Sequence, residues 1–184
     1  MLIPIEPPMM RIGNWPIYRT VTFLPSVAIL EVISVLLVLV LSPLETLPAI
    51  AVGLLLVVIH FGLELIHQYG HKIGADMSGY PSTGLRVWGP LATITYPDDE
   101  GDLPSGVHIQ RALGGPLASL LAAIPIGIIA AALWSSGTAA QILLGFALFE
   151  TVAVFGLGAL FPAQIPALDF TSDGAILLRE MRKN

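Results

Sequence analysis

Four long apolar stretches constrain the fold of this chain more than any other feature of its sequence. They cover residues 21–42, 47–71, 112–134 and 139–161, and each contains at most one Asp, Glu, Lys or Arg. A helix needs about 20 apolar residues to cross the hydrocarbon core of a bilayer. Charged residues make up only 11% of the chain, whereas a soluble domain has about 25%. The sequence therefore predicts a mainly α, polytopic membrane protein of about four transmembrane helices, embedded in the lipid bilayer as a single domain, 1–184.

The segments outside these spans differ in character. Residues 1–20 contain four prolines and are expected to form an N-terminal interfacial tail, with Trp15 and Tyr18 as aromatic anchors at the membrane surface. Residues 162–184 form a C-terminal tail that is richer in polar side chains.

A longer segment, residues 72–111, joins the second and third spans. Within it, β-branched and aromatic residues dominate two runs, 83–88 and 91–96, which is typical of strands. Gly89-Pro90 lies between the runs and indicates a turn. We therefore expect a short β-rich segment between helices two and three.

Basic residues indicate how the chain is oriented. All eight Lys and Arg lie in the N-terminal tail, the long segment or the C-terminal tail, and none lies in the short turns at 43–46 and 135–138. The positive-inside rule then predicts that both termini and the long segment face the cytoplasm. With a net charge of -5 and its few basic residues scattered, the chain shows no surface for nucleic acid. The absence of cysteine excludes thiolate metal sites.

The second span ends in a polar stripe. Because each helical residue turns about 100°, the side chains of His60, Glu64, His67 and His71 fall within about 60° of one another. Ionisable groups inside a membrane helix usually face the protein interior and serve function. The i, i+4 pair His67 and His71 can present two imidazoles to one metal ion. Interhelical hydrogen bonding is the alternative, and for His60, nearly two turns deeper, it is the expected role.

A third ligand must come from elsewhere in the chain. Asp169 and Asp173 follow the fourth span and are predicted on the same side of the membrane as His71. Residues 171–173 also resemble a helix start for 174–182, so each aspartate is either a ligand or a helix cap. Capping is the expected role of Asp169.

Three ordered motifs resemble those of site-2 proteases, the intramembrane zinc metallopeptidases. Residues 67–75 are similar to that family's H-E-x-G-H-x-x-x-A, residues 111–119 to its A-G-P-x-A-N, and residues 173–177 to its L-D-G-G-x-x-L. The resemblance implies zinc as cofactor, His67, His71 and Asp173 as its ligands, and a membrane-spanning protein substrate cleaved near the cytoplasmic face. The sequence does not define an oligomeric state.

Two positions depart from the family pattern. Ser119 stands where the family usually has Asn, and Gln68 replaces the glutamate that acts as general base. A glutamine amide can hydrogen-bond water but cannot take its proton. Three interpretations follow: a protease in which Glu64 has taken over as base, a pseudoprotease that binds zinc and a membrane partner without cleavage, or an oxidoreductase or transporter with another metal.

Three further features have open roles. The β-rich run 85–96 is expected either to hold an extended substrate by strand addition or to cover the site. Glu31 and Glu150 are single carboxylates within spans, expected to be hydrogen-bonded inside the bundle. For Glu150, a position facing the metal site is the alternative.

Overall fold

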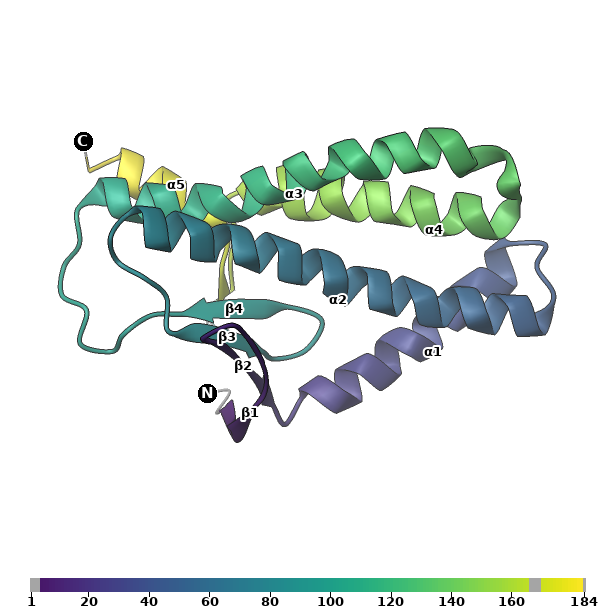
Figure 1. Ribbon diagram of the computed structural model, residues 1–184, viewed down its shortest axis with the longest axis horizontal. Helices are drawn as coiled ribbons and strands as arrows, with labels where there is room; N and C mark the ends of the chain where they lie inside the picture. Colours follow the sequence, from purple (N-terminus) through teal and green to yellow (C-terminus); the bar gives the residue numbers. More distant parts are fainter. Residues whose placement is uncertain (1–3, 166–169, 184) are drawn as a thin grey trace.

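The computed structural model describes residues 4–165 and 170–183. In this part of the chain, four helical segments are long and apolar enough to cross a membrane, which confirms the predicted fold class. They are α1 (Phe23–Leu41), α2 (Thr46–Met77), α3 (Ser105–Leu133) and α4 (Thr138–Phe149), the last continued by the π-helical η2 (Glu150–Leu157) and by η3 (Gly158–Leu160). Figure 1 shows α2, α3 and α4 side by side, with α1 crossing beside α2.

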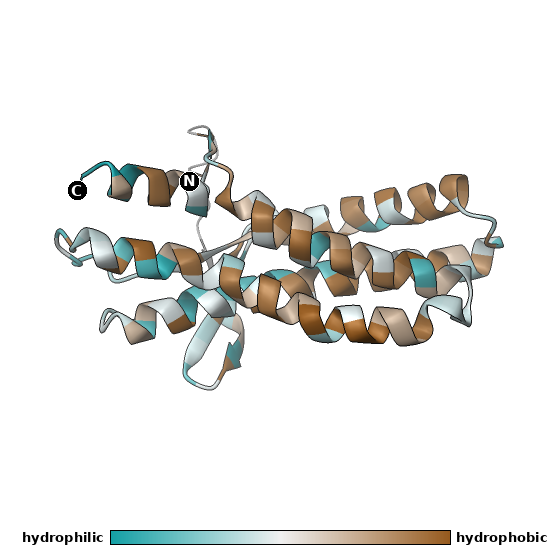
Figure 2. Ribbon diagram, turned by 90° about the horizontal axis from the view of Figure 1, so that it is seen from above, coloured by the Kyte–Doolittle hydropathy of each residue, from teal (hydrophilic) through white to brown (hydrophobic). Residues whose placement is uncertain are grey.

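The outer surface of these helices is apolar. Large side chains such as Leu36, Leu121 and Ile128 are exposed, and Figure 2 shows hydrophobic residues along the length of the helices. In water such a surface would be unfavourable by about 25 cal/mol for each Å² left uncovered. The helices therefore present to the lipid the surface that a soluble protein would bury.

The helices α2 and α3 extend beyond the predicted spans. The first continues to Met77, where Gly79 follows in a left-handed conformation with φ 81°, a common way to end a helix. The second begins at Ser105, directly after Pro104. The non-helical segment is therefore 78–104 rather than 72–111. Its two strands, β3 (Gly84–Val87) and β4 (Ala92–Thr95), lie inside the predicted runs.

The N-terminal segment is more ordered than the sequence indicates. From Pro4 onward it forms β1 (Pro4–Ile12) and β2 (Trp15–Thr20) of a four-stranded sheet with the order β1-β2-β3-β4. The strand β2 runs parallel to β3, and the other pairs are antiparallel. Proline is tolerated in an edge strand such as β1 because one side of it needs no ladder hydrogen bonds.

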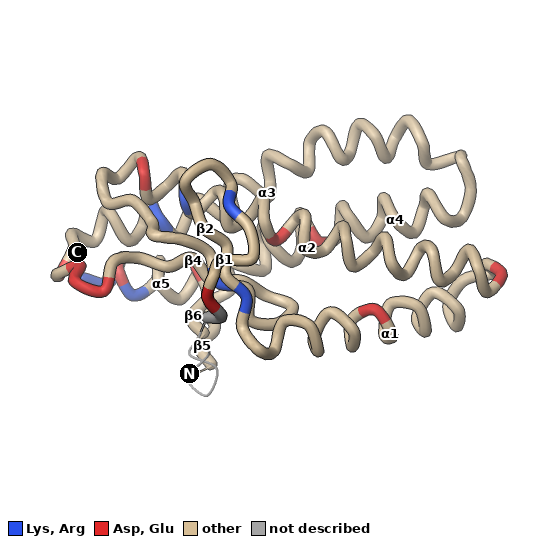
Figure 3. Tube along the Cα trace, turned by 60° about the horizontal axis from the view of Figure 1, so that its bottom comes forward, with Lys and Arg blue, Asp and Glu red and all other residues tan. Residues whose placement is uncertain are grey.

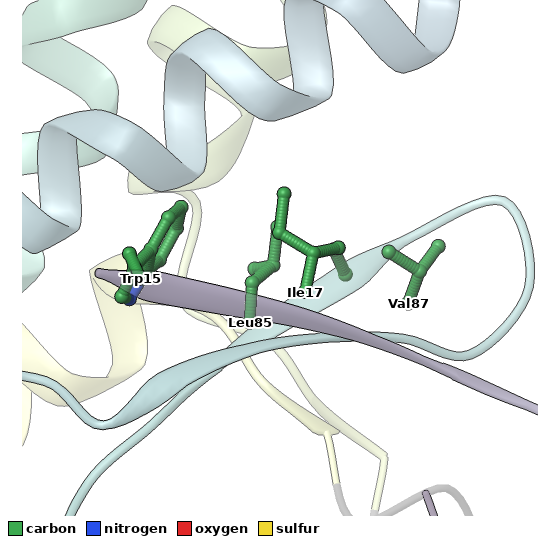
Figure 4. Packing of buried hydrophobic residues seen from close by; sticks show 5 residues of the cluster. Trp15, Ile17, Leu85 and Val87 are labelled. Carbon is green, nitrogen blue, oxygen red and sulfur yellow. The ribbon is translucent and has the colours of Figure 1, made fainter. Parts of the chain in front are cut away.

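Trp15 is therefore part of a core and does not anchor the chain at the membrane surface. It is 3% exposed and packs with Ile17, Leu85 and Val87 in the cluster drawn in Figure 4. Its indole N–H donates to the Ser82 hydroxyl at 3.1 Å. Tyr18, the other expected anchor, is half-buried in the same strand.

Glycines allow α2 and α3 to approach closely. A Cβ atom on Gly70 would lie 2.3 Å from the carbonyl oxygen of Gly114, and one on Gly74 would lie 2.6 Å from that of Gln110. Small residues four apart are a common means of close packing between membrane helices. Any side chain at these positions would separate the helices at the level of the histidines.

The C-terminal helix α5 (Asp173–Met181) packs against α3. Ser172 caps its first turn by accepting a hydrogen bond from the Ala175 N–H. A Cβ on Gly174 would lie 1.9 Å from the Leu160 carbonyl oxygen, so the second residue of α5 must be glycine for the helix to lie at this place. At the other end, hydrogen bonds from Lys183, and secondarily from Arg179 and Ser105, lower the pKa of the Glu180 carboxyl to about 2. Of these donors, Ser105 begins α3, so its hydrogen bond joins the end of α5 to α3.

Accessibility of single cysteines tests the predicted orientation. Basic residues gather in the half of the molecule that holds the sheet and α5 (Figure 3). The chain has no cysteine of its own, so a membrane-impermeant maleimide reports only the introduced thiol. We expect Asp99→Cys to react when the reagent is applied from the cytoplasmic side and Ser136→Cys to react only from the opposite side. Cytoplasmic modification of Ser136→Cys would contradict this topology.

Candidate metal centre

The structure brings three of the sequence-identified residues together. His67 and His71 lie one turn apart on α2, both buried, and their Nε2 atoms are 3.0 Å apart. Asp173, the first residue of α5, places Oδ2 3.4 Å from Nε2 of His67 and Oδ1 3.4 Å from Nε2 of His71. The three ligand atoms lie within 4.8 Å of one another, which makes them a group that could hold a metal ion.

Hydrogen bonds to the opposite ring nitrogens orient both imidazoles. The Ser119 hydroxyl donates to the Gly115 carbonyl at 3.1 Å, so its oxygen accepts the Nδ1–H of His67, also at 3.1 Å. The Nδ1–H of His71 donates to the Arg111 carbonyl at 2.8 Å. Metal-binding histidines usually donate their second N–H in this way, which fixes the tautomer. Both Nε2 lone pairs are thereby directed toward Asp173.

This donor set fits a cation. Two acceptor nitrogens 3.0 Å apart beside a carboxylate repel one another unless a proton or metal ion lies between them. Burial alone would raise the pKa of Asp173, but hydrogen bonds from His67 and His71 in their protonated, cationic form would outweigh burial and lower that pKa. A positive charge beside the group therefore keeps it a carboxylate. Two imidazoles and one carboxylate also form a known ligand set of catalytic zinc, which leaves a fourth position open.

Gly115 makes room for both rings. A Cβ atom at this position would lie 2.3 Å from Nε2 of His71 and 2.7 Å from Cε1 of His67. The motif at 111–119 therefore contributes three contacts to the site: the Arg111 carbonyl, the space at Gly115 and the Ser119 hydroxyl. In this chain, the serine hydroxyl orients His67 at the position where the family usually has Asn.

The cluster opens into a cavity of about 710 Å³. Its wall includes the three candidate ligands, Glu64 and Gln68 of α2, and residues of β4. Both Glu64 and Gln68 are buried. The Gln68 amide donates to Oε1 of Glu64 at 3.1 Å and to the Ala92 carbonyl at 2.9 Å, and the same Glu64 oxygen accepts the Ala92 N–H at 2.6 Å. These two side chains thus bind the main chain of β4 beside the cluster.

His60 and Glu150 contact each other rather than the three candidate ligands. Nδ1 of His60 lies 2.8 Å from Oε2 of Glu150, and Nε2 of His60 donates to the Pro90 carbonyl at 2.6 Å. The expected structural role of His60 is therefore confirmed, and a position of Glu150 facing the metal site is not. Oε1 of Glu31 is buried in the described structure without the hydrogen bond expected for it, and Asp169 lies outside the described residues.

The side-chain contacts of Arg111 were not predicted from the sequence. Its guanidinium holds both oxygens of Glu100 at 2.6 and 2.8 Å, donates to the Tyr80 carbonyl and stacks 3.9 Å from the Tyr96 ring. The hydrogen bonds from Arg111 lower the pKa of Glu100, while burial raises that of Tyr96 to about 12. Because the Arg111 carbonyl also orients His71, this residue ties the acidic loop to the cluster. The sequence does place this one basic residue at the start of the third span, close to the acidic loop, and that position could have indicated an ion pair between them.

Comparisons with known proteins support the fold. A solved structure, "Site-2 Protease from Methanocaldococcus jannaschii", matches with a TM-score of 0.60 and 18% sequence identity, over 100% of this chain and 72% of the other. No protein-family model and no curated protein sequence matches. This chain therefore has a site-2-protease-like fold, as the three motifs predicted.

The role of Ser119 is testable through metal affinity. Ser119→Ala removes the acceptor for the Nδ1–H of His67, and loss of such a partner typically weakens metal binding about 10- to 100-fold. Competition with a zinc-chelating dye measures the change. Ser42→Ala is the matched control, because the Ser42 hydroxyl also bonds a helix carbonyl, that of Val38, but at the far end of α1. Equal zinc affinity in both variants would exclude this role for Ser119.

Proposed function

We propose that this chain is an intramembrane zinc metallopeptidase that cleaves membrane-spanning helices near the cytoplasmic face. The observation that carries the proposal is the convergence of His67 and His71 with Asp173, about 100 residues later, within an apolar bundle. The site-2-protease-like fold supports it. The cytoplasmic position follows from the distribution of basic residues, because the cluster lies in the half of the molecule that carries them.

His67, His71 and Asp173 would hold the zinc ion. Bound zinc acts as a Lewis acid and lowers the pKa of a coordinated water to about 7. The hydrogen bonds to Ser119 and Arg111 keep both imidazoles in the tautomer that such binding requires. The apolar surroundings strengthen the electrostatic interactions at the centre, since little water is present to screen them.

Glu64 is the proposed general base. Among the described residues that line the cavity, Glu64, Glu100 and Asp173 carry carboxylates. Asp173 belongs to the ligand set, and Glu100 forms a two-point ion pair with Arg111. Glu64 is therefore the carboxylate available to take a proton from water. The Gln68 amide donates to Glu64 and orients it, but has no site that accepts a proton at neutral pH.

The substrate would bind in an extended form. A peptide bond within a helix is shielded, so a membrane-spanning segment must unwind before it can be attacked. The strand β4 is the last in the order of its sheet and lines the cavity. Its outward-facing main chain offers a place for an unwound segment to add as a further strand. The neighbouring loop is held by Arg111 and borders the same cavity.

Metal analysis combined with a cleavage assay tests the proposal. We expect purified wild-type protein to contain about one zinc ion per chain and to cleave helical membrane peptides in lipid. Replacement of His67, His71 or Asp173 by Ala should abolish both. Glu64→Gln should retain zinc and lose cleavage by about 10²–10⁴-fold. Asp98→Ala, at an exposed loop carboxylate, serves as the control and should change neither.

The outcomes separate the interpretations. Zinc without cleavage, with cleavage gained in Gln68→Glu, would indicate a pseudoprotease that binds a membrane partner. Full activity in Glu64→Gln would exclude Glu64 as the base. A wild-type protein without zinc would overturn the proposal and leave the polar residues of α2 to other chemistry.

A further inference from the structure

The polar residues of α2 fall into two groups with different contacts. His67 and His71 face Asp173. His60, Glu64 and Gln68, spaced four apart, instead contact the main chain of the β3–β4 hairpin at residues 90 and 92. The second group binds two carbonyls and one N–H, and all of these groups belong to the backbone. It is therefore independent of the hairpin's side chains.

His60 is the most N-terminal of these three residues of α2. A carbonyl only accepts hydrogen bonds, so the 2.6 Å contact with Pro90 requires that Nε2 of His60 carry a proton. On the other side of the ring, Oε2 of Glu150 lies 2.8 Å from Nδ1 and fixes the ring's orientation. Glu150 begins the π-helical turn η2, and such turns occur often at functional sites. His60 thereby joins α2, the hairpin and η2.

The segment that joins β2 to helix α1 holds the hairpin from its other side. The Thr22 hydroxyl donates to the Trp88 carbonyl at 2.7 Å, and the Thr20 hydroxyl donates to that of Val87 at 3.3 Å. The connection between β3 and β4 thus lies between α1 and α2, as Figure 1 shows. Hydrogen bonds to three successive parts of the connection, at Val87, Trp88 and Pro90, determine where the hairpin can sit.

Helix α2 carries both the candidate metal ligands and the side chains that contact the hairpin. One ring, Phe155, packs against both groups, with its centroid 5.8 Å from that of His60 and 5.5 Å from that of His67. The main-chain carbonyls of Leu91 and Thr95 accept hydrogen bonds from the β3 side of the hairpin. Because main-chain groups alternate along an antiparallel strand, those of Ala92 and Ile94 face away from β3. Glu64 and Gln68 already hydrogen-bond the N–H and the carbonyl of Ala92. Ile94 is then the next outward-facing position along the strand.

We propose that His60, oriented by Glu150, is a positioning residue that fixes the β3–β4 hairpin, and with it the outer edge of β4, in one register beside His67 and His71. We call the contacts of His60, Glu64 and Gln68 with the hairpin the clamp. A substrate segment adding to β4 would make its first main-chain hydrogen bonds at Ile94, because those of Ala92 are already taken by Glu64 and Gln68. The clamp itself needs no metal or substrate. Its consequence for substrate position rests on the proposed function.

Amide hydrogen exchange in lipid nanodiscs tests the clamp on the full chain. His60→Phe keeps a ring but removes the donor to Pro90, and we expect exchange in peptides covering 91–95 to rise about tenfold or more. His60→Gln, whose amide can donate to the same carbonyl, should restore exchange to near the wild-type rate. Thr151→Val is the matched control, because Thr151 is 0% exposed next to Glu150 but bonds only within its own helix.

A merely structural role of His60 predicts a different result. Exchange would then rise equally in α2 and α3, and His60→Gln would not restore the hairpin selectively; either finding overturns the clamp, as would unchanged exchange in His60→Phe. If His60→Phe does not fold, Glu150→Leu, which frees the ring, should raise exchange in the same peptides. Zinc content is measured in parallel: its absence in wild type overturns the proposed function but leaves the exchange test of the clamp intact.

Discussion

The convergence of two imidazoles and one carboxylate inside an apolar bundle is the constraint on which the rest of this structure depends. His67 and His71 can meet Asp173 only if α3 lies against α2 without intervening side chains, which Gly70, Gly114 and Gly115 allow. The meeting of these three residues also requires α5 to start where Gly174 lies against the Leu160 carbonyl. Among the glycines of the described structure, the four that leave least room for a side chain thus surround this cluster.

A second constraint operates on the same helix. Burying Glu64 and Gln68 would be costly without partners, and the main chain of Ala92 supplies them. A glutamine at position 68 is chemically consistent with this arrangement. An amide can donate at once to Glu64 and to a carbonyl, whereas a carboxylate at position 68 would face two acceptors. A glutamate at position 68 would therefore change contacts as well as proton-transfer capacity.

The sequence predicted those features that depend on local pattern. Long apolar runs indicated the four spans, the turn at Gly89-Pro90 placed β3 and β4, and the resemblance of three motifs implied the ligand set that the structure brings together. Features that arise from tertiary contacts were missed. The prolines of β1 are untypical of a strand, the pairing of His60 with Glu150 spans 90 positions, and the contacts of Arg111 depend on how the acidic loop folds back.

We propose that His67, His71 and Asp173 hold zinc together. X-ray absorption at the zinc edge of the purified, zinc-loaded protein tests it most directly, because imidazole rings give a distinct scattering pattern. We expect two imidazole ligands completed by oxygen, and the loss of one imidazole in His71→Ala. A coordination shell without imidazole, or one unchanged in His71→Ala, would contradict it.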